Sequence, residues 1–374
     1  MAGHVLIALR RTLPYVLGTA GVVAILVAIP IFIGSPGFGY DYSAYDMAAR
    51  RLASGGPLYP PGTAEAYNAG AYAGLYLYAP PLAVALMPVA VVSADTATML
   101  WFVARIALLV IGCALLPVRA EVRAATFGVA ALSYPVLIDL NLGNLSIILF
   151  ALSAVMWRWL DRPLGSIALG LILTVRYAFV TVLVWWLARG LIRPIAWTIG
   201  AGLVIAALTL PIVGIAGYVD YVTILRGLGD ISTGPHNLAL GTTVAALGGG
   251  PEIEILANLV GWGLALAAVV YAARRRDPEV GLAVALSATL LCAPFFHDHY
   301  LVELLVPAAL LAQRRHWWGL ALPLLGWLPE AALPLVAIAG IAGPFLAGAP
   351  PTGPDAVSDE GLREWSQAEL RGVE

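Results

Sequence analysis

Three polar positions in this otherwise apolar chain carry side chains suited to catalysis. Asp41 directly follows an apolar run and supplies a carboxylate that can accept a proton. Arg176 lies in the apolar run LILTVRYAFVTVLVWW. Burying a guanidinium in a membrane costs free energy, so its presence there indicates a functional site. A guanidinium is also suited to binding phosphate oxygens. His297 and His299 share one loop and suit a phosphate contact, proton handling or a metal. Together these residues offer a base, a phosphate-binding cation and two titratable imidazoles.

Each of these residues also has a structural explanation, which the sequence alone leaves open. Asp41 fits a turn, Arg176 could pair with a buried acid, and histidines at a membrane interface are often structural. The stretch DLNLGNLS contains Asn141 and Asn144 and has more polar side chains than one helix cap requires. We therefore expect these two asparagines either to cap the next helix or to contact a substrate.

The first polar loop predicts a short helix. Ser43 and Asp46 fit a capping box, and Asp46 with Arg50 makes an i,i+4 ion pair. In this interpretation Asp41 precedes the cap, so the helix does not need it. Tyr45 follows one turn later and suits an interfacial aromatic belt.

The composition indicates that a membrane protein positions these residues. Of 374 residues 61% are hydrophobic and only 11% are charged, with a mean hydropathy of +0.88 and a net charge of −2. A soluble domain is nearer one quarter charged, so we expect an all-α integral membrane protein. All 20 basic residues are arginine, which with the abundant alanine and glycine indicates a GC-rich bacterial genome. The predicted location is the bacterial plasma membrane.

Arginine pairs fix the predicted topology, since positively charged loops stay in the cytoplasm. Six clusters define this side: Arg10/Arg11, Arg119/Arg123, Arg158/Arg162, Arg189/Arg193, Arg274–Arg276 and Arg314/Arg315. Between the third and fourth clusters there is room only for two short helices, 163–175 and 177–188, which turn near Arg176. Residues 78–117 form either a re-entrant piece plus a span or two spans. We predict nine to eleven spans in total, with the polar loops on the extracytoplasmic side.

Two segments lie outside the spans. Residues 34–78 are too long for a simple connection and predict an extracytoplasmic cap of short surface helices. Residues 350–374 carry six acidic and two basic side chains and predict a disordered cytoplasmic tail. The run 13–33 lacks a cleavage site and is long enough to span, so we expect it to be retained. Residues 1–349 then form one transmembrane catalytic domain.

The ordered motifs resemble glycosyltransferase family 87, the polyprenyl-phosphate-mannose-dependent α-mannosyltransferases of the GT-C superfamily. The resemblance covers roughly residues 10–315. It rests on these stretches: DYSAYDMAARRLASGGPLYPP, YAPPLAVALMPVA, NLGNLSIILFAL, RYAF, HNLALGTTVAAL and HDHYLVELLVPAALL. It implies a GT-C-type helical bundle that moves a sugar, most often mannose, from a polyprenyl-phosphate carrier to a hydroxyl of a glycolipid or glycan.

The resemblance also implies roles for single residues. The family's D-x-x-x-Y pattern falls on Asp41 and Tyr45, which makes Asp41 the general base. Its hairpin lysine falls on Arg176, and its paired histidines fall on His297 and His299, here separated by Asp298. The expected substrate-binding residues are Tyr45, Tyr78, Asn141, Asn144, His236 and Asn237. The expected partners are the donor, the acceptor and the bilayer, and we expect no nucleic acid, no metal and no cofactor.

The chemistry of inversion agrees with this assignment. It needs one base at the acceptor hydroxyl, which Asp41 offers, and cationic stabilisation of the departing phosphate, which Arg176 and a histidine offer. Two alternatives remain open. One is a GT-C transferase that uses another lipid-linked sugar such as arabinofuranose. The other is a polytopic transporter of lipid or sugar, although the chain shows no inverted repeat and a transporter needs no long cap.

Overall fold

The computed structural model describes residues 2–228, 237–275, 277–293 and 295–347, with side chains from Thr12 onward. Within these ranges the chain forms α-helices and short 3-10 helices and no strand. This architecture confirms the predicted all-α multi-span membrane fold. Of the predicted elements, His236 and the tail 350–374 lie outside the described residues.

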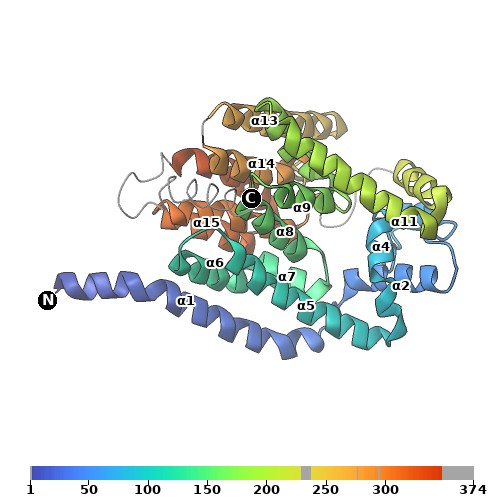
Figure 1. Ribbon diagram of the computed structural model, residues 1–374, viewed down its shortest axis with the longest axis horizontal. Helices are drawn as coiled ribbons and strands as arrows, with labels where there is room; N and C mark the ends of the chain where they lie inside the picture. The colour runs from blue at the N-terminus through green and yellow to red at the C-terminus, as the bar shows by residue number, and fades with distance from the viewer. Residues whose placement is uncertain (1, 229–236, 276, 294, 348–374) are drawn as a thin grey trace, which may run out of the picture.

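Five described helical segments are long and apolar enough to cross a membrane. They are Thr12–Ile33 of α1 (Ala2–Ile33), α5 (Ala94–Leu115), α11 (Ile192–Gly227), α13 (Pro251–Ala273) and Glu330–Ala347, which includes α17 (Leu333–Ala342). A sixth crossing results if α6 (Ala120–Leu132) and α7 (Tyr134–Leu142), bent by 63° at their junction, form one broken span. Figure 1 shows α1 along one edge of the molecule and α13 along the opposite edge.

The remaining apolar helices are shorter than the roughly 20 residues that cross a bilayer. They are Pro80–Val91, made of α4 (Pro80–Leu86) and η1 (Met87–Val91), α8 (Ser146–Arg158), α9 (Pro163–Leu173), Tyr177–Ala188, made of η2 (Tyr177–Phe179) and α10 (Val180–Ala188), and α14 (Pro278–Cys292). Length and composition of the described residues therefore support five or six crossings. The predicted nine to eleven would require short helices to combine into broken spans.

Several element boundaries agree with the sequence patterns. Two short helices, α9 and α10, meet at the turn that contains Arg176, as predicted. Residues 78–117 form the short piece α4–η1 followed by the single long helix α5, which is the first of the two predicted alternatives. The last elements are α12 (Leu240–Ala246), η4 (Asp298–Leu304), α15 (Leu305–Gln313), η5 (Trp317–Leu320), α16 (Ala321–Leu324), η6 (Leu325–Trp327), η7 (Glu330–Ala332) and η8 (Gly343–Ala347).

Residues 34–78 contain two short helices, α2 (Tyr40–Ala53) and α3 (Thr63–Asn68), and build a small core of their own. Its largest side chains are tyrosines, buried against α4 and the start of α8: Tyr42, Tyr45, Tyr59 and Tyr76. Figure 1 shows α2 and α4 at one end of the molecule, beside the end of α11. The Asn68 amide donates to the Gly227 carbonyl at 2.9 Å and ties α3 to that end.

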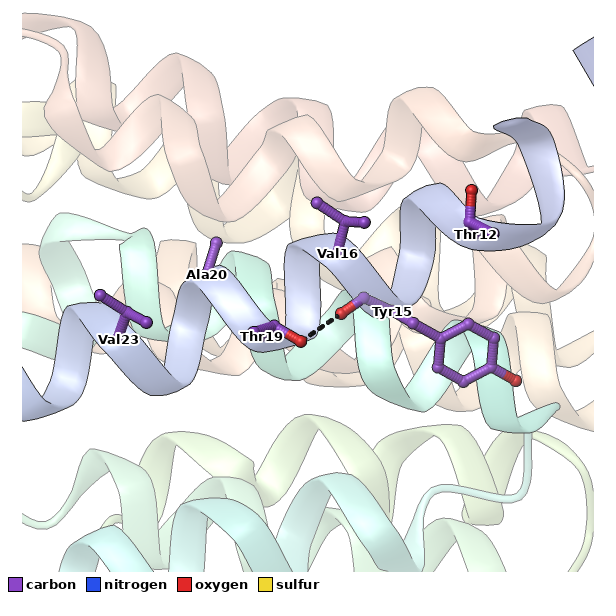
Figure 2. A pocket seen from close by; sticks show the side chains of 6 residues that line it. All are labelled: Thr12, Tyr15, Val16, Thr19, Ala20 and Val23. Carbon is purple, nitrogen blue, oxygen red and sulfur yellow. Dashed lines mark hydrogen bonds between the residues drawn. The ribbon is translucent and has the colours of Figure 1, made fainter. Parts of the chain in front are cut away.

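The first helix packs on α6 through small residues. A side chain at Gly21 would meet the backbone of Gly128 at 2.8 Å, so the two helices approach closely only because both positions are glycine. The outer face of α1 is apolar and exposed, and a shallow hollow on it is lined by Thr12, Tyr15, Val16, Thr19, Ala20 and Val23 (Figure 2). None of the predicted site residues lines this hollow, which faces outward where lipid is expected.

Candidate active site

The helix that carries Asp41 begins earlier than its sequence predicts. Gly39 adopts a left-handed conformation (φ 73°) and the helix starts at Tyr40, so Asp41 lies in its first turn. Ser43 donates its hydroxyl to the Tyr40 carbonyl and does not cap the helix. The predicted capping box of Ser43 and Asp46 is therefore wrong, because the glycine permits an earlier start. A carboxylate in the first turn is favoured by the helix dipole.

The Asp41 carboxylate is held by a residue from a distant part of the chain. Its Oδ2 accepts a 2.8 Å hydrogen bond from Nδ2 of Asn144. The Asn144 amide is itself fixed, because its Oδ1 accepts from the Leu145 backbone N–H at 2.6 Å. Asn144 is buried and Asp41 partly exposed, and Oδ1 of Asp41 has no hydrogen bond to any described residue. One oxygen is thus anchored while the other stays available.

Asn141 contributes mainly through its backbone. Its carbonyl accepts a 2.8 Å hydrogen bond from the Gly39 N–H, which ties the start of α2 to the end of α7. Its side-chain Oδ1 is buried and has no hydrogen-bond partner in the described chain. Of the two predicted asparagines, Asn144 therefore bonds Asp41 directly, and Asn141 at the end of α7 bonds Gly39, two positions before it.

Two tyrosine hydroxyls lie next to this carboxylate. Tyr45 donates to the hydroxyl of Tyr78 at 3.2 Å, and the two rings meet edge to face at 5.2 Å. Burial raises the pKa of Tyr45 far above its usual range, and the nearby Tyr78 and the negative charge of Asp41 raise it further. Both hydroxyls therefore keep their protons at neutral pH and can donate hydrogen bonds.

The Tyr78 hydroxyl experiences both of the predicted catalytic charges. Burial raises its pKa most and Tyr300 adds to the rise, while Arg176 lowers the pKa and Asp41 raises it. The charges of Asp41 and Arg176 therefore both act on the Tyr78 hydroxyl. An aspartate and an arginine that are 135 positions apart in the sequence thus influence one hydroxyl.

Arg176 lies in the turn between α9 and η2 and is buried. Its guanidinium carbon lies 3.5 Å from the centre of the Tyr300 ring, a close cation–π contact. Its Nη2 has no hydrogen-bond partner among the described residues, and no carboxylate in that part of the chain forms an ion pair with it. The alternative of a structural ion pair is therefore not observed, and a donor remains unsatisfied.

The two histidines stack on each other beside the same tyrosine. The rings of His297 and His299 lie 5.3 Å apart at 12°, and Tyr300 packs against both with its edge. Asp298 accepts a 2.8 Å hydrogen bond from the His299 backbone and lies 3.4 Å from its Nδ1. Burial favours the neutral acid, but these contacts with His299 outweigh it and lower the pKa of Asp298. Nε2 of His299 is buried without a partner in the described chain.

Asn237 has a structural contact that its sequence context did not predict. Its Oδ1 accepts hydrogen bonds from the Ala239 N–H at 3.1 Å and the Phe296 N–H at 3.0 Å. These bonds hold the start of α12 against the loop that contains the histidines. The predicted substrate-binding role of Asn237 stays a prediction, and its carbonyl oxygen is already occupied.

Sequence reasoning missed Arg105, which is 1% exposed in the middle of α5. Its guanidinium contacts Asp139, which is fully buried at the end of α7. The signal was present, because a lone arginine in the run WFVARIALLV meets the same criterion that selected Arg176. Its partners could not be predicted, since they lie more than 30 positions further along the chain.

A second hollow lies within residues 34–78, and none of the predicted site residues lines it. It is lined by Arg51, Pro60, Pro61, Gly62, Thr63, Ala66, Gly74, Leu75 and Tyr76. In the described ranges no three histidine, cysteine or acidic side chains gather as metal ligands would. The polar cluster around Tyr78 and Tyr300 therefore remains the candidate site.

Comparison with known proteins assigns the family. No curated protein and no solved structure matches the chain. The family model of glycosyltransferase family 87 matches residues 76–294, which is more than half of the chain. The matched range includes Tyr78, Asn141, Asn144, Arg176 and Asn237 and excludes Asp41 and both histidines of the HDH loop. This membrane-spanning chain is a member of glycosyltransferase family 87.

Proposed function

We propose that this glycosyltransferase moves a sugar, with mannose as the first candidate, from a polyprenyl-phosphate carrier to a hydroxyl of a glycolipid or glycan. Transfer inverts the anomeric configuration and takes place at the extracytoplasmic face. The observation that carries the proposal is that Asn144 anchors the Asp41 carboxylate while the charges of Asp41 and Arg176 both shift the pKa of the Tyr78 hydroxyl. Family membership favours this function over the transporter alternative.

Asp41 is the general base in this proposal. The acceptor oxygen attacks the anomeric carbon, the bond from that carbon to the phosphate oxygen breaks, and the acceptor proton passes to Asp41. The carboxylate suits this role because Asn144 anchors Oδ2 while Oδ1 makes no hydrogen bond to a described residue. A positioned base of this kind contributes about 100-fold to 10,000-fold to a rate.

Arg176 and the histidines receive the departing phosphate. The polyprenyl phosphate leaves with the electrons of the broken bond, and its negative charge needs donors that are already in place. Nη2 of Arg176 and Nε2 of His299 are buried donors or acceptors without a partner in the described chain. His297 stacks on His299 and adds a second imidazole at the same site. The phosphate would satisfy groups that the protein leaves unsatisfied.

The direction of α8 supports an extracytoplasmic site. Asn144 lies just before the first residue of this helix, which is 13 residues or about 20 Å long and ends at Arg158. Arg158 belongs to an arginine cluster that the positive-inside rule assigns to the cytoplasm. The end of α8 next to Asp41 then points away from the cytoplasmic side, which is the direction in which we place the donor site.

A donor panel tests this function. The purified protein in lipid vesicles receives labelled polyprenyl-phosphate mannose, glucose or arabinofuranose together with native lipid extract. We expect covalent transfer from the mannose donor, with an α-linked product from a β-linked donor, as judged by NMR of the product. Transfer from arabinofuranose alone would identify the other donor class. Movement of the donor across the bilayer without any product would contradict the proposed function.

A further inference from the structure

Arg105 donates its guanidinium almost entirely to backbone carbonyls at one turn. Nη1 donates to the carbonyl of Asp139 and, at 3.5 Å, to that of Asn144, and Nη2 donates to the carbonyl of Leu140 at 2.7 Å. Nη1 also lies 3.4 Å from Oδ2 of Asp139. The planar fork of arginine can reach several acceptors at once, which a lysine ammonium cannot do from one point.

The turn needs such donors because it ends a helix inside an apolar fold. α7 stops at Gly143, which has a φ of 87°, and its last carbonyls lose their helical partners. In a membrane no water is available to satisfy them. Trp101, one turn before Arg105 on α5, donates to the Gly143 carbonyl at 2.9 Å. Two side chains of α5 therefore hold the carbonyls of a single turn.

The same turn carries the side chain that orients the proposed base. Asn144 follows Gly143 directly, and its amide donates to Asp41 at 2.8 Å. Asp139 supports this geometry from within the turn, because its Oδ1 accepts a 3.0 Å hydrogen bond from the Ser146 N–H. Tyr42, the neighbour of Asp41, stacks on Trp101 with ring centres 5.1 Å apart. A shift of this turn would therefore move the Asn144 amide relative to Asp41.

We propose that Arg105 is a positioning residue for sugar transfer: its contacts with the carbonyls of the 139–144 turn fix Asn144 and, through it, Asp41. The inference rests on the proposed role of Asp41 as the base. Arg105 itself touches neither substrate nor reacting atoms. Its effect on the rate is therefore transmitted through Asn144, and this dependence separates it from a residue that only stabilises the fold.

Arg105→Lys is the discriminating variant. It keeps a positive charge opposite Asp139 and so avoids a buried unpaired carboxylate, but it loses the fork that spans the carbonyls. We expect kcat to fall about 10-fold with the donor KM unchanged, since displacing a catalytic group by a fraction of an ångström has effects of this order. In an Asn144→Ala background the same substitution should cause no further loss of kcat. Steady-state kinetics in vesicles for the wild type, the two single variants and the double variant completes this double-mutant cycle.

Arg314→Lys is the matched control. Arg314 is another buried arginine with acidic partners, Asp277 and Glu279, at the end of α15 and away from Asp41. We expect its substitution to lower thermal stability but not kcat. If Arg105→Lys cannot be recovered folded, Trp101→Phe removes the other α5 donor to the turn and should lower kcat in the same Asn144-dependent way.

Three results would overturn the inference. Wild-type kcat in Arg105→Lys would show that the turn does not require these donors. If Arg105→Lys cannot be recovered folded, wild-type kcat in Trp101→Phe would show the same. Losses that multiply in the Asn144 background would show that Arg105 does not act through Asn144. Full turnover by Asp41→Asn would remove the base and the inference with it, and because that variant leaves Arg105 intact, the two failures are distinguishable.

Discussion

The Asn144 amide donates a 2.8 Å hydrogen bond to the Asp41 carboxylate, joining residues 103 positions apart. This bond connects the first turn of α2, just after the first long helix, with the turn between α7 and α8. It leaves one carboxylate oxygen anchored and the other available. The proposed chemistry follows from this arrangement together with Arg176. The charges of Asp41 and Arg176 both shift the pKa of the Tyr78 hydroxyl.

Removing the amide should disturb the base without removing it. We expect Asn144→Ala to lower kcat by about 10-fold to 100-fold, because Asp41 keeps its charge but loses its orientation. The comparison is steady-state kinetics against Asn258→Ala, which removes an amide that accepts from the Gly241 N–H on α12. Asn258 lies on α13 and bonds to α12 and not to α2, so its variant should keep wild-type kcat. Equal kinetics for the two variants would contradict the orienting role.

Arg176 should govern use of the lipid-linked phosphate. We expect Arg176→Gln to lower kcat/KM for the donor about 100-fold, and Arg176→Lys to recover part of it, because lysine keeps the charge but not the bidentate geometry. Arg189→Gln is the control, since Arg189 also contacts an aromatic ring, Trp185, but at the other end of α10. An equal loss in both glutamine variants would argue for a general effect on the fold.

The contact between Asp298 and His299 should stabilise the protein in a defined pH range. Although burial opposes it, His299 lowers the pKa of Asp298 below that of an unfolded aspartate, which is about 3.9. The stabilisation is therefore present above about pH 4 and is lost as the pH falls through the lower folded pKa. Thermal unfolding of wild type and Asp298→Asn should differ just above this range, and the difference should shrink as the pH falls below it. A difference that does not change as the pH falls below 4 would exclude this origin.

Gly143 should be indispensable at the turn for two separate reasons. Its φ of 87° is strained for other residues, and an added Cβ would lie 2.7 Å from Cβ of Tyr42. We expect Gly143→Ala to lower the free energy of unfolding by about 1–2 kcal/mol because alanine disfavours a left-handed backbone. Displacing α2 to make room for the Cβ should lower it further. Gly190→Ala has a similar φ of 71° with open space around it, and so measures the conformational cost alone. Thermal unfolding should show a larger loss for Gly143→Ala, and kcat should fall only in that variant.

Sequence patterns predicted the elements that depend on local apolar runs and arginine anchors. The expected short helices 163–175 and 177–188 correspond to α9 and to η2 with α10, since arginine clusters bound both. The turn at Arg176 was predicted because too few residues separate its flanking arginine clusters. The 63° bend between α6 and α7 was not predicted, although Pro135 at the start of α7 is a local signal for a helix break.

The site was only partly accessible to sequence reasoning. Charge in an apolar run singled out Arg176, and the same criterion applies to Arg105. The start of α2 was misplaced because the left-handed conformation of Gly39 depends on the bond from its N–H to the Asn141 carbonyl, a tertiary contact. The pairing of Asn144 with Asp41 likewise depends on how distant helices pack. Such contacts leave no local pattern.

Sugar transfer by Asp41→Asn tests the central claim most directly. Asp46→Asn is the matched control, because Asp46 lies on the same helix and pairs with Arg50 at 2.7 Å instead of facing Asn144. Purified variants in vesicles are compared for transfer from the donor that the wild type uses. The account predicts at least a 100-fold loss of turnover for Asp41→Asn with intact folding, and near wild-type turnover for Asp46→Asn. Wild-type turnover by a folded Asp41→Asn protein would contradict it.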